Sequence, residues 1–232
     1  MEVDELNARL RAFYESIWPS LVANLSGYVN LSSPLLLHAS RSYAEATRRL
    51  LIVGQETHGW MDYLMAGDAP SLDLRIGELL AAYQRFALGK KKRSPFWRVA
   101  RELHSRISPE APADAFLWSN LLKVDQNKKR PHPDVSSIIL GYQLLPEEIK
   151  IIKPHIVVFF TGRHYDGFLK GTFVGADLKQ IGKHEIRVLC RVQHPALPCH
   201  AYRTYHPKYL VITHQRAAVL TAIEETARQP EG

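Results

Sequence analysis

Short apolar segments alternate with helical segments along this chain, and this alternation limits its possible folds more than any other feature. Residues 50–53, 115–124, 155–162 and 185–192 have the composition of buried strands. Between them, apolar residues recur at the three- and four-residue spacing of amphipathic helices. The pattern predicts an α/β fold, specifically a three-layer αβα sandwich with a central, mainly parallel four-stranded sheet.

The chain has 232 residues, a length that suits one domain with one core. It contains no internal repeat, no low-complexity tract and no linker rich in glycine and serine. We therefore expect a single α/β domain over residues 1–232. Residues 1–40 precede the first strand and have helical periodicity, so we expect them to form a helical N-terminal extension that packs on the domain.

The net charge of +7 favours a polyanionic partner such as nucleic acid. Two short segments are strongly basic, and Lys91, Lys92 and Arg93 belong to the first of them. These side chains are candidates for neutralising DNA phosphates. The alternative is that both segments are solvated loops that keep the protein soluble.

The cysteine content and the apolar runs argue against several other classes of protein. Two cysteines, Cys190 and Cys199, cannot make a disulfide framework or a cluster with four thiolate ligands. His194, Cys199, His200 and His206 lie close together, but their spacing matches no common metal motif. No apolar run reaches the ~20 residues that span a bilayer. We expect a cytoplasmic monomer, associated with the nucleoid when bound to DNA, without cofactor, metal or membrane contact.

Polar residues follow three of the expected strands, where an open parallel sheet binds its ligands. Glu56 follows the first strand and can activate water or stabilise a cation. Asn120 ends the second strand and can read the edge of a planar base. His194 follows the fourth and can donate a hydrogen bond to an oxygen that gains negative charge. We expect a shared site; taken singly, each residue also fits a loop or a turn.

Four motifs in this order resemble the uracil-DNA glycosylase superfamily. They are Gly-Gln-Glu-Thr-His at residues 54–58, Leu-Trp-Ser-Asn-Leu-Leu at 117–122, Ile-Lys-Pro-His-Ile-Val-Val at 152–158 and His-Pro-Ala-Leu-Pro at 194–198. Together they span about two thirds of the chain. The resemblance implies a base-flipping enzyme that cleaves the N-glycosidic bond of uracil or another damaged base in DNA.

The resemblance also implies roles for individual residues. Glu56 would orient water and offset the charge on the sugar, Asn120 would bind the base edge, and His194 would stabilise the departing base anion. Gln55, His58 and Trp60 would line the base pocket, with Tyr63, Phe96 and Trp97 as alternative stacking aromatics. Leu197 is a candidate wedge in the DNA, and Arg203 is a candidate DNA contact.

The first motif departs from the family pattern. Glu56 replaces an aspartate, and its extra methylene moves the carboxylate by about one bond length, ~1.5 Å. Thr57 stands where proline is common, and His58 replaces the tyrosine that excludes thymine. These departures leave a second hypothesis open, a non-catalytic nucleic-acid or nucleobase-binding protein with the same fold. An unrelated α/β hydrolase is less well supported, because the chain has no Gly-x-Ser-x-Gly motif and no phosphate loop.

Overall fold

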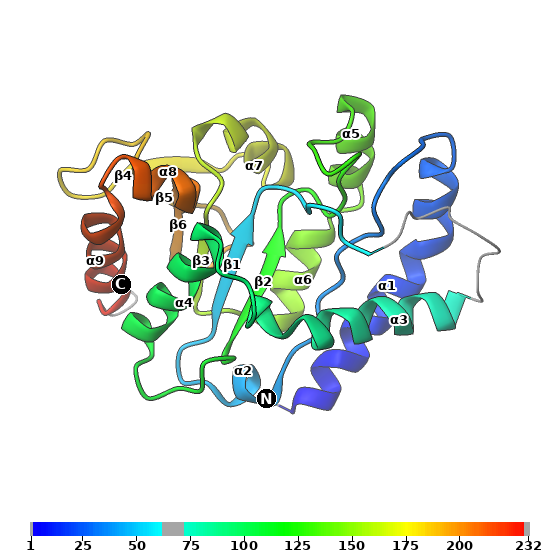
Figure 1. Ribbon diagram of the computed structural model, residues 1–232, viewed down its shortest axis with the longest axis horizontal. Helices are drawn as coiled ribbons and strands as arrows, with labels where there is room; N and C mark the ends of the chain where they lie inside the picture. Colours follow the sequence, from blue (N-terminus) through cyan, green and yellow to red (C-terminus); the bar gives the residue numbers. More distant parts are fainter. Residues whose placement is uncertain (1, 62–71, 230–232) are drawn as a thin grey trace.

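Six strands form one mixed sheet in the computed structural model, which describes residues 2–61 and 72–229 (Figure 1). The strand order is β2-β1-β3-β6-β5-β4. The strands are β1 (Leu50–Gly54), β2 (Phe116–Asn120), β3 (Ile156–Phe159), β4 (Asp177–Gln180), β5 (Leu189–Gln193) and β6 (His200–Thr204). The first four in that order are parallel, whereas β5 and β4 are antiparallel to their neighbours.

The predicted α/β class and the mainly parallel sheet are confirmed, but the expected number of four strands is wrong. The sequence pattern missed β4 and β6. Three of the four residues of β4 are exposed, and β6 is fully buried although it contains His200, Arg203 and Thr204. Neither strand is a run of apolar residues. As a consequence, the segment expected to be the fourth parallel strand is β5, which runs in the opposite direction.

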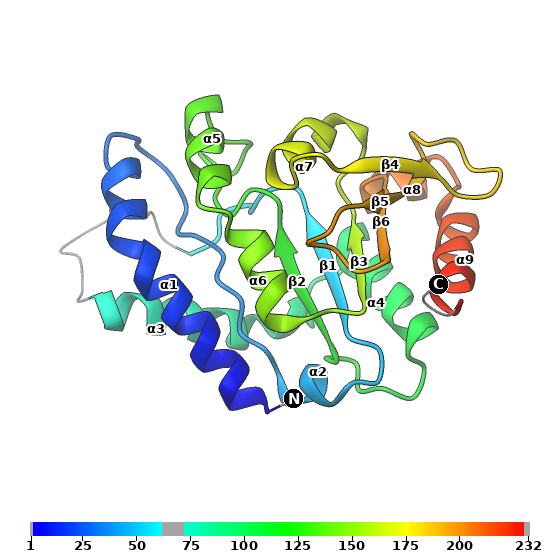
Figure 2. The same ribbon diagram turned by 180° about the vertical axis from the view of Figure 1, so that it is seen from behind.

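Helices cover both faces of the sheet. Figure 1 shows α3 and α4 in front of the strands, and Figure 2 shows α1 and α6 in front of them from behind. The helices are α1 (Val3–Leu25), α2 (Arg41–Glu45), α3 (Leu72–Phe86), α4 (Pro95–Ile107), α5 (Pro133–Gly141), α6 (Leu144–Ile152), α7 (Asp166–Thr172), α8 (Pro207–Ile212) and α9 (Arg216–Ala227), with short 3₁₀ turns η1 (Ala87–Gly89) and η2 (Arg163–Tyr165). Within the described ranges, no helix is both long enough and apolar enough to cross a membrane.

The N-terminal segment is helical only in its first part. Helix α1 continues through Pro19 and ends at Leu25, and residues 31–37 are buried without forming a helix. The backbone N–H of Ser32 donates to the carbonyl of Asp125 (2.9 Å), and that of Leu35 donates to the carbonyl of Lys123 (2.8 Å). The segment beyond α1 is thus hydrogen-bonded to the chain that follows β2 and forms part of the core.

A buried ionic network joins α1 and this segment to the sheet. Lys123, just after β2, forms an ion pair with Glu148 of α6, and both side chains are almost completely buried. The hydroxyl of Tyr14 in α1 donates to Glu148 Oε1 (2.9 Å) and accepts the backbone N–H of Leu37 (2.9 Å). The N-terminal segment therefore completes the hydrogen bonding of a charge in the core.

Candidate functional site

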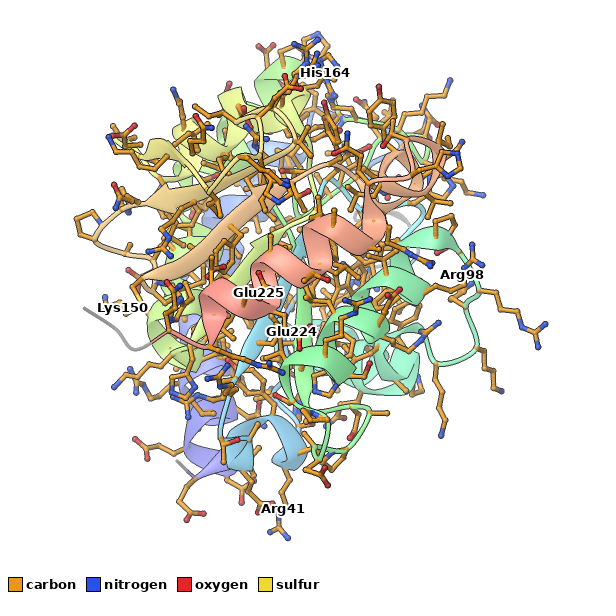
Figure 3. All side chains as sticks on the ribbon, turned by 90° about the vertical axis from the view of Figure 1, so that its left-hand side faces the viewer. Arg41, Arg98, Lys150, His164, Glu224 and Glu225 are labelled. Carbon is orange, nitrogen blue, oxygen red and sulfur yellow. The ribbon has the colours of Figure 1, made fainter. Side chains whose placement is uncertain are left out.

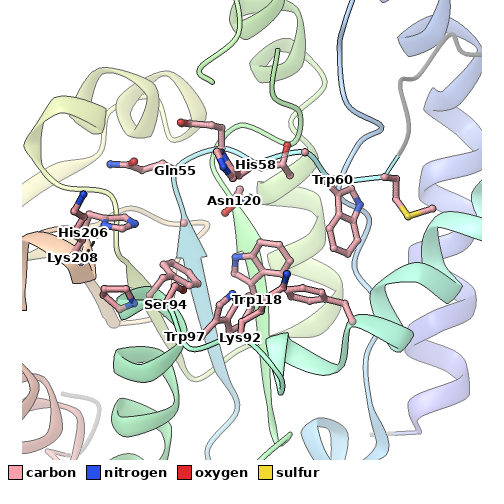
Figure 4. A pocket seen from close by; sticks show the side chains of 18 of the residues that line it. Gln55, His58, Trp60, Lys92, Ser94, Trp97, Trp118, Asn120, His206 and Lys208 are labelled. Carbon is pink, nitrogen blue, oxygen red and sulfur yellow. Dashed lines mark hydrogen bonds between the residues drawn. The ribbon is translucent and has the colours of Figure 1, made fainter. Parts of the chain in front are cut away.

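A cavity of about 830 Å³ lies at the carboxyl ends of β1 and β2 (Figure 4). This is the edge at which an open parallel sheet binds ligands, as the sequence predicted. Much of its wall is aromatic, contributed by Trp60, Phe86, Phe96, Trp97 and Trp118. Its polar lining includes Gln55, Glu56, Thr57, His58, Arg85, Lys92, Ser94, Asn120, His206 and Lys208. Five of the residues predicted for the site are thus brought together, namely Gln55, Glu56, His58, Trp60 and Asn120.

Asn120 is 1% exposed and sits beside Gly54 in the register of β1 and β2. A Cβ atom at position 54 would lie 2.3 Å from Asn120 Oδ1, so only glycine leaves room for this amide. The Nδ2 atom of Asn120 is buried and has no hydrogen-bond partner among the described residues. Leaving a buried donor unpaired costs about 1–3 kcal/mol. An acceptor atom on a ligand in the cavity would remove that penalty.

Glu56 is half-buried and accepts a hydrogen bond from the hydroxyl of Tyr165. The Nε of Arg130 donates in turn to the oxygen of that hydroxyl (3.0 Å). Burial raises the pKa of Glu56, while the hydrogen bond from Tyr165 and the positive charge of Arg130 act in the opposite direction. The carboxylate is therefore held in place, and the groups around it favour its ionised form.

Asp125 holds the loop that carries the first motif. The hydroxyl of Thr57 (2.8 Å) and the backbone N–H of Gly59 (2.7 Å) both donate to Asp125 Oδ2. The backbone N–H of Lys128 donates to Oδ1 of the same carboxylate (2.8 Å). These bonds fix the turn at the position where proline is common in the resembling family, so threonine does not leave this loop unsupported.

His194 does not line this cavity, and its expected place in the site is wrong. It follows β5, which is antiparallel to β6, so it lies at the opposite end of the neighbouring strand. Its Nε2 is 3.2 Å from the carbonyl oxygen of Val174, and its ring contacts that of Phe173. Leu197, from the same segment, is half-buried against the core and is not part of the cavity lining.

His206 supplies the imidazole at the cavity instead. It follows β6, which is parallel to β3, and its ring stacks on that of Phe96 with centroids 6.0 Å apart. Its Nδ1 accepts the backbone N–H of Lys208 (3.2 Å), so the neutral ring carries its proton on Nε2. Burial lowers the pKa of His206, and the charge of Lys208 acts in the same direction.

The sequence contained a signal for this residue. A His-Pro pair occurs twice, at His194-Pro195 and at His206-Pro207, and only the second follows a parallel strand. Recognising β6 would have identified His206 as the site residue.

The predicted cationic contacts have different environments. Lys91, Lys92 and Arg93 are exposed, and Lys92 lines the cavity. Arg203 is 1% exposed and is paired with Asp166 (2.8 Å), so the prediction that it contacts DNA is wrong. It was taken for a loop residue because β6 was not recognised. Two further exposed cations line the cavity, Arg85 and Lys208.

Trp60 lies in the wall of the cavity but is 8% exposed. It packs edge-on against Phe86 and Trp118. Phe96 is half-buried at the start of α4 and also lines the cavity, which makes it the better placed aromatic for a planar ligand. Tyr63, the other alternative that the sequence offered, lies outside the described residues.

In the part of the chain that the structure describes, no group of three or more His, Cys, Asp and Glu side chains is arranged to hold a metal ion. No protein-family model matches the sequence, and neither does any curated protein. The functional argument therefore depends on the geometry of the cavity.

Proposed function

We propose that this protein is a DNA glycosylase of the uracil-DNA glycosylase superfamily, which hydrolyses the N-glycosidic bond of a flipped-out uracil or other damaged base. One observation carries the proposal. A carboxylate, an amide with an unpartnered donor and an imidazole, from the carboxyl ends of three different strands, line one cavity. The motif at residues 54–58, which resembles that superfamily, supplies the carboxylate.

In the proposed reaction, cleavage leaves positive charge on the sugar and negative charge on the base. Glu56 offsets the first charge and orients the attacking water. His206 takes the role that the sequence assigned to His194, because its protonated Nε2 can donate to a base oxygen that becomes an anion. Asn120 binds the edge of the base, with its unpartnered Nδ2 as the donor.

A polynucleotide substrate is supported by the cations around the cavity. Arg85, Lys92 and Lys208 come from α3, the loop before α4 and α8, and all three line it. The exposed Lys91 and Arg93 continue this cationic rim beside Lys92. Such a rim can bind the phosphates on either side of an extruded nucleotide. DNA in the cytoplasm is the substrate that this arrangement fits.

The proposal can be tested with oligonucleotides that carry uracil, hypoxanthine, xanthine or a mismatched thymine, followed by alkaline cleavage of abasic sites. We expect strand cleavage for at least one base. His206→Ala and Asn120→Ala should each lower the rate on the order of a hundredfold, whereas the matched variant His194→Ala should retain it. Salt-sensitive DNA binding without product on any base would favour the non-catalytic alternative, which the replacement of aspartate by Glu56 also suggests.

A further inference from the structure

Tyr165 connects two loops at the carboxyl end of the sheet. It ends η2, just after β3, and is 3% exposed. Its hydroxyl donates to Glu56 Oε2 and accepts from Arg130 Nε. Because the hydroxyl has only one hydrogen to give, the bond from Arg130 directs that hydrogen toward Glu56.

Arg130 is held by more than this hydrogen bond. Its guanidinium carbon lies 4.4 Å from the ring centroid of Tyr165 and 5.5 Å from that of Phe168. A guanidinium over an aromatic face is attracted by the ring quadrupole. The position of Arg130 is therefore determined by two rings and one acceptor, which makes it a rigid donor.

We propose that Tyr165 and Arg130 are positioning residues, which form a relay that anchors Oε2 of Glu56 and leaves Oε1 for the nucleophilic water. A glutamate has one more rotatable bond than an aspartate, so an unanchored Glu56 would sample more orientations. Misplacement by about 1 Å can cost a hundredfold in rate. The catalytic consequence rests on the proposed function, whereas the anchoring itself does not.

Several charged groups act on Glu56 besides the relay. Asp125 lies on the loop after β2, and His58 lies on the motif loop itself. Burial has the largest effect and raises the pKa of the Glu56 carboxyl, and Asp125 raises it further. Tyr165, Arg130 and His58 lower it. Removal of the Tyr165 hydroxyl leaves burial less opposed, so the carboxyl should bind its proton at higher pH.

The relay can be tested directly by ¹³C NMR titration of glutamate carboxyl groups in the full-length protein, with the Glu56 signal assigned by Glu56→Gln. We expect the titration midpoint of Glu56 to move to higher pH in Tyr165→Phe and in Arg130→Met. Tyr142→Phe is the matched control, because that hydroxyl bonds only Asn24 and Ser20 among the hydrogen bonds described for it. An unchanged midpoint in folded Tyr165→Phe would overturn the relay.

The pH profile of base excision gives the second measurement. In Tyr165→Phe the acid limb of kcat/KM should move to higher pH, with a rate on the order of tenfold lower at pH 5 and a smaller loss at pH 8. An equal loss at every pH would indicate a structural role only and contradict the relay. If the wild-type protein excises no base, the proposed function fails, and the NMR midpoint still decides the relay. Should Tyr165→Phe not fold, Arg130→Met serves in both measurements.

Discussion

At the residue scale, the site depends on a close approach between β1 and β2. Gly54 faces Asn120 across the two strands, and the space that a side chain would fill holds the Asn120 amide oxygen. The position of the amide is thus set by the absence of a methyl group on the neighbouring strand. A substitution at Gly54 consequently tests the amide without altering it chemically.

Gly54→Ala should lower base excision by at least tenfold, because its Cβ would lie 2.3 Å from Asn120 Oδ1 and displace the amide. The measurement is the single-turnover rate on the best substrate, with thermal unfolding to confirm the fold. Gly141→Ala is the matched control, since a Cβ there meets no atom within 4 Å. A Gly54→Ala enzyme as active as the control would show that the orientation of Asn120 does not matter.

At the element scale, the strands explain which site residues could be predicted from the sequence. β1 and β3 are unbroken apolar runs, and β2 is mainly apolar and fully buried, so Glu56 and Asn120 could be assigned to strand ends. β6 is also fully buried, but Arg203 within it is neutralised by Asp166. Because a tertiary partner makes this burial possible, hydrophobicity along the sequence does not reveal it. Without β6, the direction of β5 and the identity of the imidazole could not be deduced.

The Lys123–Glu148 pair offers a prediction about how the elements are joined. Lys123→Met leaves Glu148 as a buried charge without its cation, so we expect the free energy of unfolding to fall by about 3–5 kcal/mol. The double variant with Glu148→Gln should recover much of this loss, because the amide oxygen can still accept from Tyr14. Urea unfolding provides both values.

Lys150→Met is the control for this pair. Lys150 pairs with Glu147 on the surface and is 71% exposed, so its loss should change the unfolding free energy by only about 0.5 kcal/mol. If Lys123→Met is no more destabilising than Lys150→Met, the buried network does not hold α1 against the core.

At the scale of the whole molecule, charge and cavity share one end of the sheet. The net charge is +7, and three exposed cations, Arg85, Lys92 and Lys208, border the cavity. Lys150 lies across the sheet from Arg98 of α4, the helix whose start lines the cavity, as Figure 3 shows. The same kind of side chain is therefore available on a face that the cavity does not reach.

Salt dependence should distinguish these two groups of cations. Each phosphate contact with duplex DNA contributes about −0.9 to the slope of log affinity against log salt concentration. Lys92→Gln and Lys208→Gln should each make the slope less steep by about one, while Lys150→Gln should leave it unchanged. Fluorescence anisotropy with a labelled duplex between ~50 and 200 mM salt measures the slopes. Equal slopes in all three variants would mean that binding follows net charge alone, and the rim of the cavity would then have no particular role in holding DNA.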